Sequence, residues 1–284
     1  MFKRFIRQIT PPFLVPLARS IFHLLKPISP IYEGLYLKRD QLPPVTSNPF
    51  EHPNWITYVG ARAESRKLGV ATQDMHEMCL SLISSLACQQ ALGASRTVID
   101  FGGGVGMYWP AVKAQNKSRM ATKFVVVDSP SNCETGRMLF GTDGVEFFPE
   151  LEQAVAKNST IHVLNVASTL HYCLEYEAVI ALLCRSQATF IIISRHPAPE
   201  DGQPVAYAIQ NVTTVKGFCG QIPVILLSVQ LLEALMCKNG YTLIADYFND
   251  ADADKYWKGS KQEISVGYAS IIEHAIVFQR RHAD

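Results

Sequence analysis

The sequence predicts a doubly wound α/β sheet preceded by a helical and irregular N-terminal extension. Two observations lead to this prediction. Short apolar runs and helix-compatible segments alternate from Thr97 to Phe248, as they do where each strand of a parallel sheet is followed by a crossover helix. The run at 188–194 contains almost only apolar residues, which is typical of a central strand covered on both faces.

The composition indicates one large domain with an extension. The chain has 284 residues, 48% of them hydrophobic, and a net charge of +1. So small a charge argues against a nucleic-acid partner held by a general basic field. The seven cysteines are scattered and never form C-x-x-C, which predicts reduced thiols in a cytoplasmic protein and no metal site.

Residues 1–70 are predicted to form a basic amphipathic extension and linker, and residues 71–284 the main domain. Five lysines and arginines precede the first acidic residue, Glu33, and bulky apolar side chains lie between them. Such a segment can lie on an anionic membrane, here the inner face, or it can pack on the domain or on a second subunit of a homo-oligomer; both readings stay open. Prolines and turn formers at 40–60 predict an irregular linker.

The first element of the main domain is predicted to be a helix at 72–93, whose apolar residues repeat on one face. A strand then runs from Thr97 into Asp100 and a glycine turn. A strand, a glycine turn and a helix start make a nucleotide site, since glycine lets the backbone approach a ligand closely. The dinucleotide fingerprint G-x-G-x-x-G fails here, because Met107 or Trp109 stands where the third glycine belongs.

A second apolar run ends at Asp128, about 20 residues past the glycines, where an acid can meet ribose hydroxyls. Alone, such an aspartate is usually a cap or turn former. Ser131 and Glu134 follow with capping-box spacing and predict a helix start. Further strands are expected at 145–148, 161–166, 188–194, 241–248 and 273–280, helices at 175–186 and 226–239, and a structureless functional loop of about 25 residues from Arg195.

The acid two residues before G-x-G-x-G, formed by Asp100, Gly102, Gly104 and Gly106, resembles the first motif of class I S-adenosylmethionine-dependent methyltransferases. The resemblance implies a Rossmann-like, seven-stranded, mostly parallel sheet and S-adenosylmethionine as cofactor. It also implies which residues bind that cofactor. Asp100 and the glycine backbone would hold the aminoacyl end, Asp128 the ribose and Phe147 the adenine, with Asn165 of the fourth strand as a further contact.

A narrower resemblance joins the glycine motif to the segments 168–172, 193–197 and 240–241. Together they look like methyltransferases encoded among bacterial surface-polysaccharide genes. This resemblance covers roughly residues 50–248 and implies a small-molecule or glycan acceptor, either a sugar or a lipid-linked glycan.

Transfer to a sugar hydroxyl needs a base, and histidine is the usual one near neutral pH. His171 is the first candidate and His196 the second, because each is expected to follow a strand at the ligand-binding edge; Glu175 and Asp201 are alternatives. Two other functions stay open. One is a nicotinamide-dependent oxidoreductase, which the failed third glycine disfavours, and the other is a catalytically silent membrane-associated scaffold.

Overall fold

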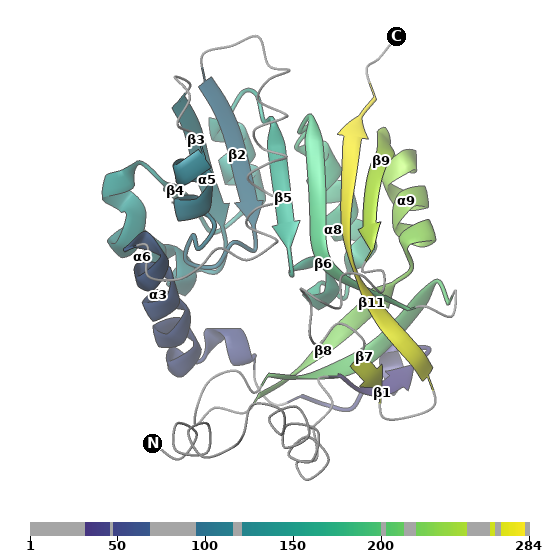
Figure 1. Ribbon diagram of the computed structural model, residues 1–284. Coiled ribbons are helices and arrows are strands. Elements are labelled where there is room, and N and C mark those ends of the chain that lie inside the picture. Colours follow the sequence, from purple (N-terminus) through teal and green to yellow (C-terminus); the bar gives the residue numbers. More distant parts are fainter. Residues whose placement is uncertain are drawn as a thin grey trace, which may run out of the picture.

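The computed structural model describes residues 32–45, 48–68, 95–115, 121–199, 203–212, 220–248, 262–264 and 268–281. A mostly parallel sheet carries helices on both faces, and a small antiparallel sheet lies at one end of it (Figure 1). The predicted doubly wound fold is therefore confirmed. The helix predicted at 72–93 and the basic segment 1–30 lie outside the described residues.

The central sheet places its strands in an order that reverses beside β2. From one edge to the other the order is β4 (Glu146–Phe148), β3 (Ala121–Val127), β2 (Ser95–Phe101), β5 (Val163–Ala167), β6 (Phe190–Pro199), β11 (Tyr268–Arg280) and β9 (Tyr241–Phe248), and β10 (Gln262–Ile264) also pairs with β11. Strands β2 to β6 are parallel, and β11 is antiparallel to both neighbours. The chain moves outward from β2 to β4 and then crosses back to β5. The reversal between β2 and β5 is the place where open α/β sheets bind ligands.

Helices cover both faces because the strands are apolar on both sides. In β3, the side chains of Phe124 and Val126 join one core cluster, and those of Val125 and Val127 join the other, as the two-residue period of a strand requires. The first cluster includes residues of α3 (Pro53–Lys67), α5 (Trp109–Gln115) and α6 (Pro130–Phe140), and the second includes residues of α7 (Leu151–Lys157), α8 (Tyr176–Arg185) and α9 (Val229–Lys238).

The expectation of a structureless loop after Arg195 was wrong. β6 continues to Pro199, and β7 (Val205–Val212) and β8 (Gly220–Leu227) form an antiparallel sheet with β1 (Tyr32–Tyr36). Pro197 and Pro199 suggested a break, but beyond Ser194 β6 pairs with β11 alone, and proline is tolerated where one side of a strand is unpaired. The helix expected from Leu226 starts later, at Val229, after the cap residue Ser228.

Two helix starts also differ from the prediction. The proline-rich segment expected to be irregular contains short 3-10 turns and α3, which begins at Pro53 because His52 Nδ1 accepts a hydrogen bond from Asn54 N at 3.2 Å. Proline is favoured at the first helical position, where its missing N–H costs nothing. α6 starts two residues before the expected capping box, and its cap is Ser129. The described helices include none that is long and apolar enough to cross a membrane.

Candidate active site

The glycine turn follows directly on β2. Gly102, Gly104 and Gly106 all have positive φ, at 72°, 59° and 88°, a region that other residues enter only at a cost. A Cβ on Gly102 would lie 2.1 Å from Thr169 Oγ1, whereas a Cβ on Gly104 would meet no atom within 4 Å. The backbone at Gly104 therefore borders open space, where a ligand can approach it.

Asp100 is the buried acid beneath this turn. Its side chain is 1% exposed, and its Oδ1 accepts a hydrogen bond from Asn165 Nδ2 at 2.7 Å. Oδ2 is also buried, and it has no partner among the described residues. A Cβ on Gly103 would lie 2.4 Å from it, so the turn closes directly over the carboxyl group.

Burial determines the charge of this group. It raises the pKa of Asp100 to about 7; the hydrogen bond from Asn165 opposes the rise and the nearby charge of Asp128 adds to it. A cation placed against Oδ2 would stabilise the ionised form and lower this pKa. The unpaired Oδ2 is therefore the atom of this carboxyl group that has an acceptor site left over.

Asp128 holds the same turn from the next strand. Its Oδ2 accepts from Gly104 N at 2.7 Å, and its Oδ1 accepts from Ser129 N and Asn132 Nδ2, both at 2.7 Å. A carboxylate has about four acceptor sites, so these three bonds leave room for one further donor. Asp128 thus fixes the glycine turn, and its predicted ribose contact stays a prediction.

The other two predicted cofactor contacts are buried beside the turn. Asn165 is 1% exposed and its Oδ1 has no partner in the described part of the chain. Phe147 is 5% exposed and packs between Gly106 and Gly136, where an added Cβ would come within 3.3 Å and 2.2 Å of its ring. Its ring therefore supports the turn from the core side, and whether it also borders an adenine stays a prediction.

Both candidate histidines lie on the far side of β5 from the glycine turn. His171 is in η5 (Leu170–Tyr172), just after β5, whereas His196 lies inside β6 and does not follow it. Burial lowers the pKa of His171 to about 3 and that of His196 to about 4. His196 Nε2 lies 3.0 Å from Leu227 O. Both imidazoles are therefore neutral at pH 7, which a base requires, but weakly basic.

Of the two acidic residues considered as alternative bases, Glu175 and Asp201, the structure describes only Glu175. Glu175 is exposed and bonded to Arg39, at the start of α8. Asp201 lies outside the described residues. Within the described ranges, His, Cys, Asp and Glu side chains form no group of three or more that could hold a metal ion.

Sequence reasoning missed two features of the structure. The first is a strained backbone at two residues, one just after β5 and one inside β6. Ser168 and Arg195 have positive φ, at 54° and 53°, although neither is glycine. Arg195 is the extra residue where the pairing of β6 with β11 shifts register, which is a bulge, and bulges are frequent next to active sites. Positive φ outside glycine costs about 1–2 kcal/mol, and no sequence signal predicts it at these two positions.

The second missed feature is a polar pair across β9 and β11. His274 Nδ1 and Asp246 Oδ1 lie 2.8 Å apart, and His274 stands opposite His196 in the neighbouring strand. The signal was available, because Asp246 is the only charged residue of β9. A half-buried polar pair therefore lies on the two strands beyond β6, next to the buried His196.

Aromatic rings border the carboxyl edge of the sheet from the N-terminal side. The ring of Phe50 lies 5.0 Å from that of Trp55 and 4.8 Å from that of Tyr172, measured between centroids. Trp55 packs on the core cluster that contains Trp109 of α5, and Tyr172 is the last residue of η5. Half-buried rings thus link the N-terminal segment to the end of β5.

The chain matches no protein-family model, and no curated protein matches it. Solved structures do resemble it. A S-adenosylmethionine-dependent methyltransferase from Clostridium acetobutylicum has a TM-score of 0.48 and 10% identity, over 80% of this chain and 100% of that one. The N-terminal domain of EvdMO1, solved with SAH and D-fucose, has a TM-score of 0.46 and 14% identity, over 79% and 97%.

A third similar structure is the Burkholderia thailandensis 1,6-didemethyltoxoflavin-N1-methyltransferase with bound 1,6-didemethyltoxoflavin and S-adenosylhomocysteine. Its TM-score is 0.47 at 14% identity, over 85% of this chain and 94% of that one. Likenesses this distant assign no activity to this chain. Its function has to follow from its own residues.

Proposed function

We propose that this chain is a class I S-adenosylmethionine-dependent methyltransferase whose cofactor binds over the carboxyl ends of β2, β3 and β5. One observation carries the proposal: the buried Asp100 Oδ2 has no partner among the described residues and lies beneath the glycine turn. An unmade hydrogen bond at a buried carboxylate is costly. The ammonium group at the aminoacyl end of S-adenosylmethionine supplies the cation that this oxygen lacks.

The surrounding residues fit the rest of the cofactor. Open space at Gly104 leaves the turn accessible to a ligand. Asp128 has one acceptor site to offer a ribose hydroxyl, and the orphaned Asn165 Oδ1 can accept from the same ligand. The pattern also suits this cofactor better than a dinucleotide, because the turn lacks the third glycine of the dinucleotide fingerprint, which allows the helix to pack closely on the strand.

When bound, the cofactor would supply an electrophilic sulfonium methyl group for transfer to the acceptor oxygen, with S-adenosylhomocysteine as the leaving group. The residues of the chain position the acceptor and take up its proton. We propose His171 as the proton acceptor and His196 as the second candidate. Because burial keeps the pKa of His171 at about 3, we expect positioning to contribute more than proton transfer.

The acceptor we propose is a hydroxyl of a sugar or a lipid-linked glycan in surface-polysaccharide synthesis. Support comes from the short segments 168–172 and 193–197, which carry the resemblance to that group of enzymes. The half-buried rings of Phe50, Trp55 and Tyr172 add to it, since aromatic faces pack well on the C–H faces of sugar rings.

Calorimetric titration of the purified protein tests the proposal. We expect saturable binding of S-adenosylmethionine and of S-adenosylhomocysteine, and none of NAD⁺ or NADH. Binding of a nicotinamide cofactor alone would favour an oxidoreductase. Binding of neither cofactor would refute the proposal and favour a catalytically silent scaffold.

Replacing His171 by alanine tests its role. We expect transfer of labelled methyl groups to a panel of sugars and lipid-linked saccharides to fall by about 10–100-fold, at or below the lower end of general-base effects because the imidazole is weakly basic. The affinity for S-adenosylmethionine, measured by titration, should stay nearly unchanged. Unchanged turnover would remove His171 from the mechanism.

We also propose that residues 1–30 hold the enzyme on the cytoplasmic membrane face. Each lysine or arginine near an anionic surface contributes about 1 kcal/mol, so five of them with a few inserted phenylalanine and leucine side chains would give reversible binding. Full-length protein should sediment with anionic liposomes, less so at high salt, and a variant lacking residues 1–30 should not. Equal sedimentation of both, or of neither, would indicate an arm packed on protein instead.

A further inference from the structure

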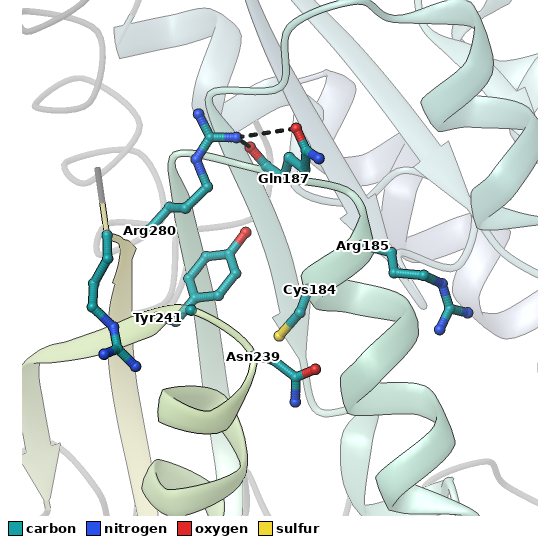
Figure 2. Close-up of a pocket in the computed structure, with 8 residues that line it drawn as sticks. Cys184, Arg185, Gln187, Asn239, Tyr241 and Arg280 are labelled. Carbon is teal, nitrogen blue, oxygen red and sulfur yellow. Dashed lines mark hydrogen bonds between the residues drawn. The ribbon is translucent and has the colours of Figure 1, made fainter. Parts of the chain in front are cut away.

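A hollow lies at the end of the central sheet opposite the glycine turn, where the parallel strands begin. It is a pocket of about 470 Å³ between the ends of α8 and α9 and the adjoining ends of β9 and β11 (Figure 2). A water molecule occupies about 30 Å³ in the liquid. The pocket therefore has room for much more than a single ion.

Among the residues that the structure describes, the charged side chains that line this pocket are all of one sign. They are Arg185, Arg280 and Arg281, and no described aspartate or glutamate lines it. Helices α8 and α9 both end here, and each carries about −0.5 of an elementary charge at its C-terminus. Three guanidinium groups against two such helix ends leave an excess of about +2.

The arginines keep donors for a ligand. Arg280 Nη1 donates to Gln187 O at 2.8 Å, and Arg281 donates to Cys237 O. Each guanidinium has five N–H groups, so these bonds use only part of the set. Arg185 is exposed and points outward in Figure 2, and a solvent-exposed side chain changes rotamer on the nanosecond timescale.

The backbone beside the pocket differs between the two helix ends. After α8 the chain turns through Gln187 with φ 53°, and after α9 it turns through Gly240 with φ 87°. Glycine is the usual residue at this position because it has no Cβ. At the end of α8 a long amide side chain occupies it, and in Figure 2 this amide faces Arg280 inside the pocket, 3.5 Å from its Nη1. Gln187 is therefore held in a conformation that costs stability, and such residues are often found at functional sites.

We propose that this pocket binds a small anion of the diphosphate type, held by Arg185 and Arg280 with the Gln187 amide as a further donor. The excess positive charge selects an anion, and the volume allows two linked phosphate groups. This inference does not depend on the methyltransferase proposal, because the pocket and the glycine turn lie at opposite edges of the sheet.

Calorimetric titration of the full-length protein with inorganic pyrophosphate, at constant ionic strength, tests the inference. We expect saturable binding with one site per chain. Arg185→Ala and Gln187→Ala should each weaken it by about tenfold, the usual loss for a hydrogen bond to a charged group. Arg62→Ala, which removes the same charge from the exposed face of α3, serves as the matched control and should leave the affinity unchanged.

Three results would overturn the inference. Absence of saturable binding would refute the site. An equal loss in Arg62→Ala and Arg185→Ala would show attraction to general positive charge. Tighter binding of citrate than of pyrophosphate would refute the diphosphate assignment. The melting temperature of each variant, measured without ligand, shows whether a lost affinity reflects a misfolded protein.

Discussion

The two edges of the central sheet, at the carboxyl and the amino ends of its parallel strands, differ in whether their buried polar groups have hydrogen-bond partners. At the carboxyl edge, Asp100 Oδ2, Asn165 Oδ1 and His171 Nδ1 are buried and have no partner among the described residues. At the amino edge, the Tyr241 hydroxyl donates to Ala188 O at 2.8 Å and Arg280 donates to Gln187 O. One edge leaves buried groups unpaired, and the other pairs its buried group and exposes its charges.

The difference indicates how each edge would bind. An unpaired buried polar atom costs about 1–3 kcal/mol, so several together indicate that a ligand or ordered water completes them. The carboxyl edge therefore fits a ligand that enters deeply and satisfies fixed groups. The amino edge has little to complete, and its arginines would attract a ligand by charge.

The sharpest way to break this comparison is Asp100→Asn. Without the charge, we expect the dissociation constant for S-adenosylmethionine to rise by about 100-fold, because a charge-assisted hydrogen bond contributes up to about 3 kcal/mol. Titration calorimetry measures it. Asp143→Asn, which removes a carboxylate from the surface ion pairs with Lys67 and Lys113, is the control and should bind normally.

The same variant should be more stable than the parent when no ligand is bound. The ordinary pKa of 3.8 is raised to about 7 by burial, which at pH 8 corresponds to about 4 kcal/mol of destabilisation. The new amide N–H would be buried without an acceptor, so we expect a gain of about 1–3 kcal/mol in urea unfolding. An unstabilised variant with normal affinity would show that the carboxyl edge is ordinary core.

The pH dependence of stability sharpens the comparison further. Between about pH 4.5 and 6 the unfolded chain holds protons on His171 and His196 that the folded chain lacks, while folded Asp100 holds one that the unfolded chain lacks. For these three groups together, the unfolded chain binds one proton more than the folded chain. Their contribution therefore makes the unfolding free energy rise by about 1.4 kcal/mol per pH unit. In Asp100→Asn the slope should double. If the histidines titrated normally, the unfolding free energy of the parent would instead fall with pH by about 1.4 kcal/mol per unit because of Asp100 alone, and that of Asp100→Asn would not change with pH.

Much of the fold could be predicted because strand and helix patterns are local. The apolar runs of β2 to β6 and of β9 each have a pattern that their own residues reveal. The glycine turn with Asp100 and Asp128 is adjacent in sequence to the strands that carry it. The small sheet was missed because the segment after Arg195 has little periodicity and contains Pro197, Pro199 and Pro223, and prolines argue against strands unless one side of the strand is unpaired. That condition depends on which strand lies alongside, which the local pattern does not reveal.

The site was predictable only in part, for the same reason. The positions of Asp100 and Asn165 followed from strand ends, but their mutual hydrogen bond depends on β2 and β5 being neighbours. The weak basicity of His171 and His196 results from burial by distant segments, and the partner of His196 is the carbonyl of Leu227 in β8. Burial of this kind cannot be read from a residue and its near neighbours.

The smallest expected effect tests the amino edge. Gln187 has φ 53° after α8, where α9 is followed by Gly240 at φ 87°. A left-handed conformation costs about 1–2 kcal/mol for a residue with a side chain, and glycine loses about 0.5–1 kcal/mol through its flexible unfolded state. Gln187→Gly should therefore stabilise the protein by about 0.5–1 kcal/mol, measured by urea unfolding. Gly240→Ala, the matched change at α9, should destabilise it by a similar amount. If Gln187→Gly were destabilising, the glutamine would be a structural anchor for Arg280, and the amino edge would contain no strain that a ligand has to explain.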